Sequence, residues 1–247
     1  MMTSKPFSKV AAILFASLLV APVALESSAT EDSDLSLGEG AQTERIKARH
    51  MLNWAAYGAG EIAADHGQII ISEADESAGI MLVSPKSYCG DVILRYDTQV
   101  LNAATVMVTN LAVSGVNGSD LSFPNGYAAD VQYMFDHLSM YNLVYHASAH
   151  NRPGPFLRRF PEPGRERMAV RTGHAVETGK YHAMEAGRVG DRVWLSVDGE
   201  TVVEWQDSDP HTEGHIIFRI RGTAPEHAAA LIRNVEIINR PDDATCS

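Results

Sequence analysis

Short segments in which apolar and polar residues alternate recur through most of the chain. In Asp91–Val100, Val92, Leu94 and Tyr96 fall on one side of an extended backbone, and Arg95 falls on the other. This period of two predicts a half-buried strand, because successive side chains of a strand point to opposite faces. Further segments of strand character cover residues 68–72, 79–84, 105–114, 143–148, 168–171, 181–186, 214–221 and 228–238.

The best hairpin signal lies in residues 191–205. Two alternating apolar runs flank Asp198-Gly199 there, and Asp-Gly is a dipeptide that two-residue hairpin turns favour. Counting both of its strands, the chain has ten or eleven predicted strands, which Gly, Asn, Pro and Ser separate.

Helical patterning is confined to two places. Residues 127–140 carry apolar side chains at i, i+3, i+4 and i+7, which predicts one short helix between strands. Residues 41–50 are expected to form a helical turn. Many strands and little helix predict an all-β protein, an antiparallel jelly-roll β-sandwich of two curved sheets. A closed barrel needs similar strands, but the helical insert and the uneven loops favour the sandwich.

The N-terminus has the pattern of a secretory signal. Lys5 and Lys9 precede an apolar run at 10–20, and small residues at Ser27 and Ala29 fit cleavage before residue 30. We therefore expect an exported protein, periplasmic or extracellular, with no stable membrane insertion, because the run is too short to cross a bilayer comfortably.

The sequence then predicts four segments. Residues 1–29 are the signal peptide, 30–44 a disordered lead-in, 45–240 the jelly-roll domain and 241–247 a C-terminal tail.

The charge balance limits the class of partner. The chain has 20 Lys and Arg against 31 Asp and Glu, a net charge of −11. Removing residues 1–29 takes away two Lys and one Glu, so 18 − 30 gives −12. An acidic exported protein is not expected to bind nucleic acid.

Two cysteines, Cys89 and Cys246, leave a choice open. They form one disulfide in an oxidising compartment, or Cys246 stays unpaired on the tail. No CxxC spacing or nearby His indicates a metal site, and no Asp-rich loop specifies calcium. We expect no metal and no catalytic cofactor.

Residues 141–160 hold the densest functional chemistry. The strand expected at 143–148 breaks at Asn-Arg-Pro-Gly-Pro, a strong turn signal. Imidazoles and phenols transfer protons, and guanidinium groups bind carboxylates or sulfates. This stretch is predicted to line a cleft for an acidic saccharide. Its candidate residues are His146, His150 and Tyr145 for catalysis, and Arg158, Arg159 and Asn151 for substrate binding.

Each of these candidates has an alternative reading. His146 and His150 share a face if the strand continues, and Tyr145 then points the other way. Either imidazole can equally be a half-buried histidine with a backbone partner. Arg158 and Arg159 are adjacent, so they face opposite ways, and one of them is expected to pair with carboxylates.

Other candidates lie outside this stretch. Arg219 and Arg221 share one face of a predicted strand and form the preferred anion clamp. Asn110 lies between apolar neighbours and needs a partner if it is buried, either a sugar hydroxyl or a structural bond. Trp205 is a candidate stacking platform, whereas Trp194 is expected in the core.

The last third of the chain resembles a known family. The segments GKYHAMEAGRVGDRVWLSVDGETVVEWQD, GHIIFRIR and IRNVEII, together with YHASAHNRPGPFLRRFP, are similar to the concanavalin A-like jelly roll of the YesU-like group of exported bacterial domains. The resemblance covers roughly residues 51–239. It implies the lectin/glucanase jelly roll and an association with degradation of plant or algal polysaccharides.

Departures from better-known jelly rolls narrow the chemistry. Laminarinase-type enzymes carry E-x-D-x-x-E on one strand, and the run Glu73-Ala74-Asp75-Glu76 has the wrong spacing. Hydrolysis by two carboxylates is therefore disfavoured. Alginate-lyase-type jelly rolls use Arg, His and Tyr, which this chain has without that family's surrounding sequence.

Three functions remain open. The first is a polysaccharide- or oligosaccharide-degrading enzyme on an acidic glycan, acting by β-elimination, in which Arg neutralises the uronate and His or Tyr removes a proton. The second is a non-catalytic carbohydrate-binding module. The third is a hydrolase of keto sugars.

Overall fold

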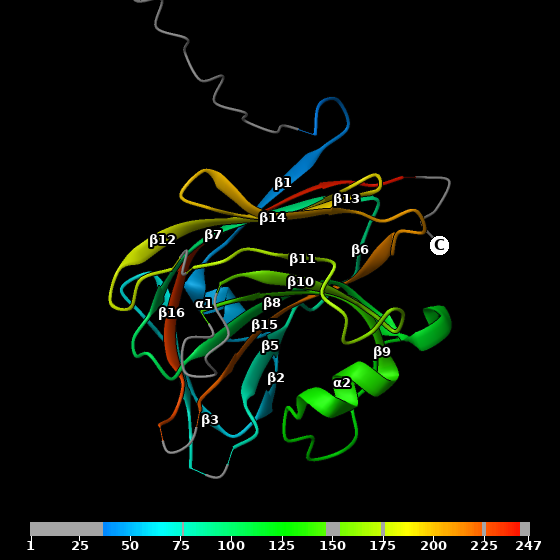
Figure 1. The fold of residues 1–247 in the computed structure, drawn as a ribbon. Coiled ribbons are helices and arrows are strands. Elements are labelled where there is room, and N and C mark those ends of the chain that lie inside the picture. The colour runs from blue at the N-terminus through cyan, green and yellow to red at the C-terminus, as the bar shows by residue number, and fades with distance from the viewer. Residues whose placement is uncertain (1–36, 76, 147–153, 174–175, 224–225, 243–247) are drawn as a thin grey trace, which may run out of the picture. The chain divides into compact units, whose positions relative to one another are not determined.

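The computed structural model describes residues 37–75, 77–146, 154–173, 176–223 and 226–242. Two antiparallel sheets face each other in this part of the chain (Figure 1). The all-β sandwich prediction is confirmed. The signal peptide, residues 30–36 of the lead-in and residues 243–247 of the tail lie outside the described residues.

Sheet I runs in the order β14-β13-β12-β7-β16-β4-β3, and β1 also pairs with β16. Its strands are β14 (Glu200–Gln206), β13 (Arg192–Val197), β12 (Tyr181–Val189), β7 (Asp91–Val100), β16 (Ala229–Arg240), β4 (Gln68–Glu73), β3 (Gly60–Asp65) and β1 (Gln42–Ile46).

Sheet II runs in the order β11-β10-β9-β8-β15-β5-β2, and β6 also pairs with β15. Its strands are β11 (Ala169–Val170), β10 (Phe156–Phe160), β9 (Leu138–Tyr145), β8 (Val106–Gly115), β15 (Glu213–Arg221), β5 (Ile80–Val83), β2 (Ala55–Gly58) and β6 (Tyr88–Cys89). The helical elements are α1 (Ala48–Met51), α2 (Val131–His137) and the 3₁₀ turn η1 (Val116–Gly118).

The main core lies between the two sheets and follows from their alternation. Leu94 and Tyr96 of β7 meet Phe218 of β15, and the Tyr96 and Phe218 rings pack edge to face with centroids 4.9 Å apart. Burying each such side chain stabilises the fold by roughly 1.5–3 kcal/mol. Alternate residues on the same strands face outward, which leaves the outer face of sheet II for other side chains.

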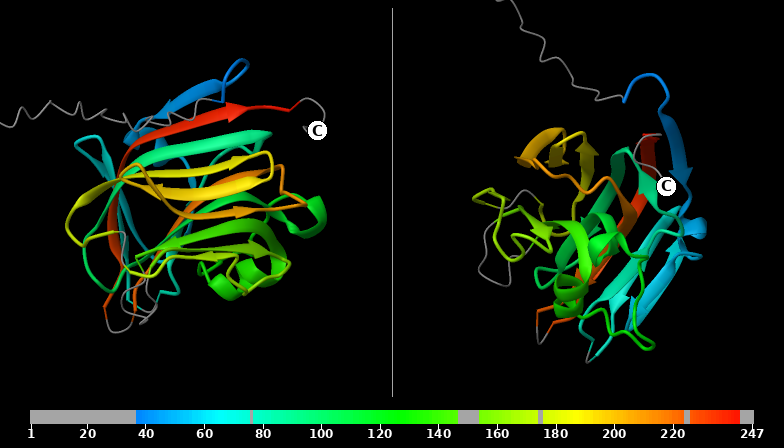
Figure 2. Two further views of the ribbon diagram at one scale, coloured as in Figure 1. Left: turned by 45° about the horizontal axis from the view of Figure 1, so that its top comes forward. Right: turned by 90° about the vertical axis from the view of Figure 1, so that its right-hand side faces the viewer.

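The connection between β8 and β9 covers part of that outer face (Figure 2). Its helix α2 begins at Asp130, whose Oδ1 accepts from the backbone N–H of Gln132 at 3.1 Å, a normal N-cap. Met134 of α2 packs there against Met81, Met140 and Ile217, which are buried on the outer face of the sheet.

Several element boundaries differ from the sequence predictions. The helix covers 131–137 instead of 127–140, because Leu138 already opens β9, which is buried along its whole length. β1 starts at Gln42, inside the predicted lead-in. Of the helical turn predicted at 41–50, only the end is helical, as α1 at Ala48–Met51, and residues 42–46 belong to β1. The turn signal that follows residues 143–148 predicts no strand at 156–160, yet these residues pair with β9 as β10.

Two further predictions concern the membrane and the disulfide. No helix among the described residues is long and apolar enough to cross a bilayer. Cys89 is disulfide-bonded. Cys246, the other cysteine of the chain, lies outside the described residues.

Candidate functional site

Strand register aligns polar side chains in a row on the outer face of sheet II. Arg158 of β10 is opposite Asn142 of β9, and Asn142 is opposite Asn110 of β8. Directly opposite residues of antiparallel strands project to the same face with Cβ atoms roughly 5 Å apart. Three residues that are far apart in the sequence therefore become neighbours.

The adjacent row begins apolar and ends in a cation. Phe156 is opposite Val144, Val144 is opposite Val108, and Val108 is opposite Arg219. Two residues further along β15, on the same face, Arg221 is opposite Val106. The predicted pairing of Arg219 and Arg221 on one face is thus realised in the register of β15 against β8.

A cavity of about 260 Å³ opens over these two rows, and we call it the arginine pocket. Helix α2 and the β10–β11 loop contribute its remaining walls. Its lining residues are Val106, Val108, Val131, Phe135, Asn142, Val144, Phe156, Arg158, Arg165, Arg219 and Arg221. Four of them are arginines, and none of the described lining residues is acidic.

Arg219 is a buried cation held by backbone carbonyls. It is 3% exposed; its Nε donates to Ala129 O at 3.2 Å, and its Nη2 donates to Ala129 O at 3.0 Å and to Ala78 O at 2.7 Å. Burial, with the nearby Arg221 charge, lowers the pKa of Arg219 to about 10. Its guanidinium group donates to no carboxylate in the described part of the chain, so an anion in the pocket would stabilise this charge.

Aromatic rings lie against the guanidinium groups of two other pocket arginines. Arg158 lies 4.7 Å from the Phe156 ring centroid, and Arg165 lies 5.1 Å from that of Phe135. Arg167 also lies over Phe156, at 4.4 Å. These are cation–π distances, and they reduce the entropy that each side chain loses when it binds an anion.

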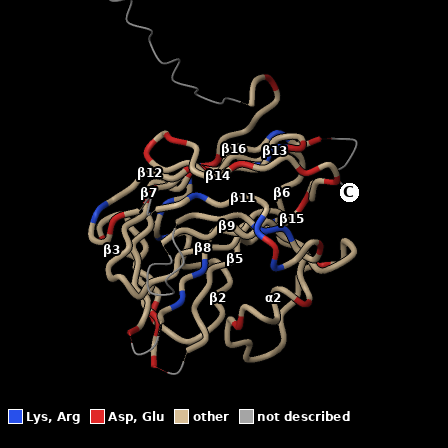
Figure 3. Tube along the Cα trace, in the orientation of Figure 1, with Lys and Arg blue, Asp and Glu red and all other residues tan. Residues whose placement is uncertain are grey.

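The positive pocket contrasts with the rest of the molecule. The whole chain carries −11, and acidic positions are spread over loops at the top, left and bottom of Figure 3. A concentration of positive charge in a low-dielectric cavity focuses the field on an entering ligand.

Asn110 and Asn142 form a buried amide pair beside the pocket. They are 0% and 3% exposed, and Asn142 Nδ2 donates to Asn110 Oδ1 at 2.7 Å. Asn110 Nδ2 and Asn142 Oδ1 have no hydrogen-bond partner among the described residues. The prediction that Asn110 needs a partner is met in part, by another asparagine.

Tyr145 lies on the opposite side of the sheet from the pocket. It is 0% exposed in the main core, and its hydroxyl lies 2.8 Å from that of Tyr96 and 3.4 Å from Thr109 Oγ1. Burial raises its pKa to about 12. The proposal that Tyr145 transfers a proton to substrate is corrected by this position, because period-two alternation turned the phenol inward.

His146 follows β9 and is 6% exposed. Its Nδ1 is 2.6 Å from Thr105 O, and its Nε2 is 3.1 Å from Thr178 Oγ1. The carbonyl requires the proton on Nδ1, so Nε2 accepts from the threonine hydroxyl. This matches the alternative reading of a half-buried histidine with a backbone partner. His150 and Asn151 lie outside the described residues.

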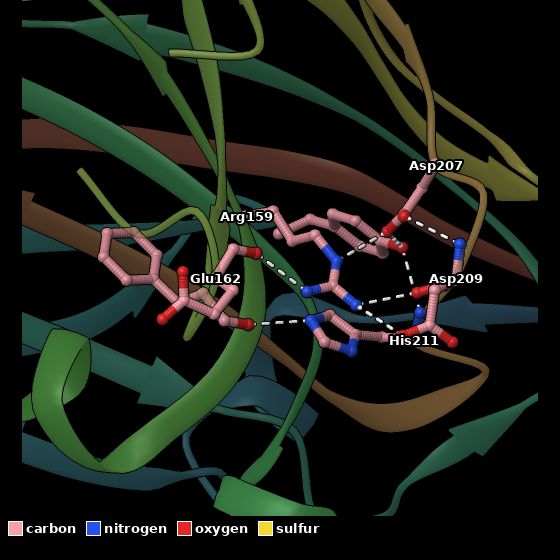
Figure 4. A network of polar contacts seen from close by, with 7 residues as sticks. Arg159, Glu162, Asp207, Asp209 and His211 are labelled. Carbon is pink, nitrogen blue, oxygen red and sulfur yellow. Dashed lines mark hydrogen bonds and ion pairs between the residues drawn. The ribbon is translucent and has the colours of Figure 1, made fainter. Parts of the chain in front are cut away.

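Arg159 faces away from the pocket into a separate polar network (Figure 4). Its Nε donates to Asp207 Oδ2 at 2.7 Å, and its Nη1 and Nη2 donate to the backbone carbonyls of Glu162 and Asp209, both at 2.7 Å. The Tyr141 hydroxyl donates to the same Asp207 oxygen at 2.6 Å. Of the adjacent arginines, Arg159 therefore pairs with carboxylate and Arg158 lines the pocket.

The tryptophans lie away from the arginine pocket. Trp205 of β14 is half-buried against the main core, opposite Val193. Trp194 is buried on sheet I, where its Nε1 donates to Glu185 Oε1 at 2.9 Å. Trp205 is not placed as a stacking platform in this pocket.

Sequence reasoning missed several lining residues. Asn142, Phe156, Arg165 and the α2 residue Phe135 were not singled out. The alternation of 156–160 carries a signal for them, because Phe156, Arg158 and Phe160 share one face once that segment is recognised as a strand. Arg165 is brought to the pocket by a loop, which no periodicity indicates.

Metal chemistry has no candidate site in the part of the chain that the structure describes. No group of three or more His, Cys, Asp or Glu side chains there is arranged to hold a metal ion. The described lining of the arginine pocket has four guanidinium groups, one amide and no carboxylate, a set that repels a cation instead of binding one.

Comparison with profiles of known protein families and with curated protein sequences finds no significant match. Solved structures do match. A Bacillus subtilis protein of unknown function with a galectin-like fold superposes with a TM-score of 0.68 at 20% identity, over 80% of this chain and 96% of that one.

Two other similar structures have carbohydrate ligands or substrates in their names. A β-1,3-1,4-glucanase (lichenase) from a mouse hindgut metagenome matches with a TM-score of 0.54 at 11% identity, over 81% of this chain and 99% of that one. The carbohydrate-binding module CBM66 from Bacillus subtilis matches with a TM-score of 0.50 at 14% identity, over 74% and 94%. At these identities the likeness establishes the galectin-like and glucanase-like jelly roll.

Proposed function

We propose that the protein is an exported carbohydrate-binding protein that recognises an acidic saccharide in the arginine pocket. One observation carries the proposal: four arginines line a cavity in which none of the described lining residues is acidic. Guanidinium forks bind carboxylates and sulfates in a two-pronged geometry. The signal-like N-terminus supports export, and the hairpin segments support a place in the YesU-like group.

The apolar lining suits a sugar. Phe156, Val108 and Val144 present carbon surface beside the cations, and sugar C–H faces pack on aromatic rings. The glucanase and carbohydrate-binding module with the same fold support the saccharide class. The positive charge supports the acidic class.

A lyase is the second candidate. Arginines that neutralise a uronate carboxylate acidify the neighbouring C–H, which favours β-elimination. That reaction also needs a base within hydrogen-bond reach of the proton. Tyr145 and His146 do not supply it, since one is in the core and the other is bonded at both ring nitrogens. His150, the third predicted catalytic residue, lies outside the described residues, so binding is the function that the described residues support better.

The test is calorimetric titration of the protein with uronate-containing, sulfated and neutral oligosaccharides. Only acidic ones should bind, with affinity that falls as salt rises. Arg221→Ala should weaken binding roughly 10–100-fold, the effect of losing one charged hydrogen bond. Arg45→Ala, an exposed arginine paired with Glu236 outside the pocket, is the charge-matched control and should bind normally.

Two results would change the proposal. Equal affinity of Arg221→Ala and the unaltered protein for every acidic glycan would remove the arginine pocket as the site. Ultraviolet absorbance from an unsaturated uronyl product would establish the lyase instead of simple binding.

A further inference from the structure

The outer face of sheet II is divided into a filled half and an open half. Over β5 and the start of β9, the β8–β9 connection buries Met81, Val83, Leu138 and Met140 in a second apolar cluster. Beside this cluster, the outward residues of β8, β9, β10 and β15 form the arginine pocket. A ligand on this face has only the second half available.

Helix α2 forms the wall between the two halves. Its Val131 and Phe135 side chains line the arginine pocket, while Met134 faces the second apolar cluster and is 0% exposed. The Phe135 ring stacks on Phe160 of β10 with centroids 4.2 Å apart and planes 2° apart. The helix is therefore fastened to the sheet along its pocket side.

The segment that leads into α2 is also held in place. Arg219 bonds the carbonyl of Ala129, directly before the helix, at 3.2 and 3.0 Å. The rings of Phe123, Tyr127 and Tyr133 pack on one another, with centroids 5.0 Å apart for both Phe123–Tyr127 and Tyr127–Tyr133. Moving α2 aside to let a chain pass would break these contacts together, which is unfavourable.

The size of the pocket also favours a small ligand. Its volume of about 260 Å³ falls below the roughly 300–1,000 Å³ of cavities that hold drug-sized ligands. One monosaccharide unit with its bound water fits this space. Val131 and Phe135 of α2 line one side of it, so we expect a second linked unit on that side to meet the helix.

We infer that the arginine pocket takes a single acidic sugar unit at the end of a chain, so that the protein recognises chain ends and not the interior of a polymer. This inference rests on the proposed function. The guanidinium groups of Arg158, Arg219 and Arg221 hold the anionic substituent, and α2 stops the chain from continuing beyond that unit.

The experiment compares ligands that differ in length only. The acidic monosaccharide, its oligomers of two to six units and a long polymer of the same sugar are titrated into the full chain by calorimetry. Affinity per molecule should change less than about threefold from monosaccharide to hexamer. Partial depolymerisation of the polymer multiplies its chain ends at constant mass. It should therefore make the polymer a stronger competitor of the monosaccharide for the protein, in proportion to the number of ends.

The outcomes separate this inference from the function it rests on. A rise in affinity of more than tenfold between dimer and hexamer, or competition that follows polymer mass and ignores ends, would overturn end recognition and leave acidic-saccharide binding intact. Absence of binding to every acidic ligand would overturn both. Phe135→Ala, which lowers the wall, should selectively strengthen the hexamer over the monosaccharide. Trp205→Ala, which removes a half-buried aromatic side chain of sheet I outside the pocket, should leave that ratio unchanged.

Discussion

Asn142 Nδ2 donates to Asn110 Oδ1 at 2.7 Å in the row of outer-face residues that ends at Arg158. Exchanging O and N on both amides leaves the same count, since one amide donor and one amide acceptor remain without a partner among the described residues. A buried polar group without a partner lowers stability, typically by about 1–3 kcal/mol. The two asparagines therefore lower the stability of the fold, and they lie beside the pocket that we assign to sugar binding.

Replacing the two amides should affect stability non-additively. Asn110→Leu alone leaves Asn142 with neither of its polar groups bonded, so the free energy of unfolding should fall by about 1–3 kcal/mol. The double variant Asn110→Leu/Asn142→Leu removes every unpaired group and should be close to the unaltered protein or more stable. Urea denaturation of the single and double variants gives the coupling between the two sites.

A satisfied asparagine is the control for this cycle. Asn239 Nδ2 donates to Cys89 O at 2.8 Å and to Asp91 O at 3.0 Å, so Asn239→Leu should only destabilise. Additive losses at Asn110 and Asn142 would contradict the account of a half-satisfied pair.

The binding cations were predictable because they depend on period two alone. Arg219 and Arg221 are two apart, so any extended backbone places them on one face, and Arg158 and Arg159 must separate. Their convergence with Asn110 depends on register, which local sequence does not state. The bulge in β8 between Leu111 and Ser114, with Ala112 at φ 52°, shifts that register further.

The catalytic candidates show the limit of reasoning from local density. Tyr145 and His146 were chosen because polar groups crowd residues 141–160, but the same alternation that predicts a strand buries the phenol among Tyr96 and Thr109. Core hydroxyl networks and active sites use the same side chains. Whether a tyrosine belongs to a core network or to an active site is decided by the strands that pack against it, which the local sequence does not show.

Strand recognition failed where flanking residues dominated the pattern. β10 lies between turn-forming prolines, which predict a loop from the local sequence. Its strand conformation depends on pairing with β9, which the local sequence does not show. β1 has no buried alternation, since four of its five residues are exposed, and it is held as an edge strand by hydrogen bonds to β16. The central strands β7 and β15, which are largely buried and alternate clearly, were predictable.

Asp207 should be a large contributor to stability. Its carboxylate accepts from Arg159 Nε at 2.7 Å and from the Tyr141 hydroxyl at 2.6 Å, with a side chain 4% exposed. Asp207→Ala leaves a mostly buried guanidinium without its counter-charge and should lower the free energy of unfolding by about 3–5 kcal/mol. At roughly 2–4 °C per kcal/mol, thermal denaturation will show the loss clearly.

Asp209 supplies the matched control on the same arginine. Its carboxylate is 3.5 Å from Arg159 Nη2 and its side chain is 97% exposed, so Asp209→Ala should produce no resolvable shift in melting temperature. Similar melting temperatures for the two variants would show that the ion pair between Asp207 and Arg159 does not stabilise the fold more than the exposed pair does.

Gly187 is required by the indole of Trp194. A Cβ on Gly187 would lie 2.1 Å from Trp194 Cζ2, because the ring lies directly against this backbone. Gly187→Ala should displace the ring, disturb its 2.9 Å bond to Glu185 and destabilise the protein by about 1–3 kcal/mol. Near-ultraviolet circular dichroism should change with it.

The double variant Gly187→Ala/Trp194→Leu tests the steric explanation. It should lose less free energy of unfolding than the two single variants lose together. A loss equal to the sum of the two single losses would refute the explanation.

His211 should make the fold less stable in mild acid. Burial first, and then the Arg159 charge, lower its pKa from the ordinary value of 6.5, and its Nε2 is 2.7 Å from Phe160 O. Above that ordinary value the ring is neutral in both the folded and the unfolded chain. As the pH falls through it, the unfolded chain takes up a proton that the folded chain resists, so the free energy of unfolding drops with a slope of at most about 1.4 kcal/mol per pH unit.

His211→Gln keeps a donor for the carbonyl and removes the titration, so its stability should decline less steeply than that of the unaltered protein between pH values above and below the ordinary pKa. Parallel stability curves for the two proteins, measured by urea denaturation across that range, would show that His211 titrates alike in both states.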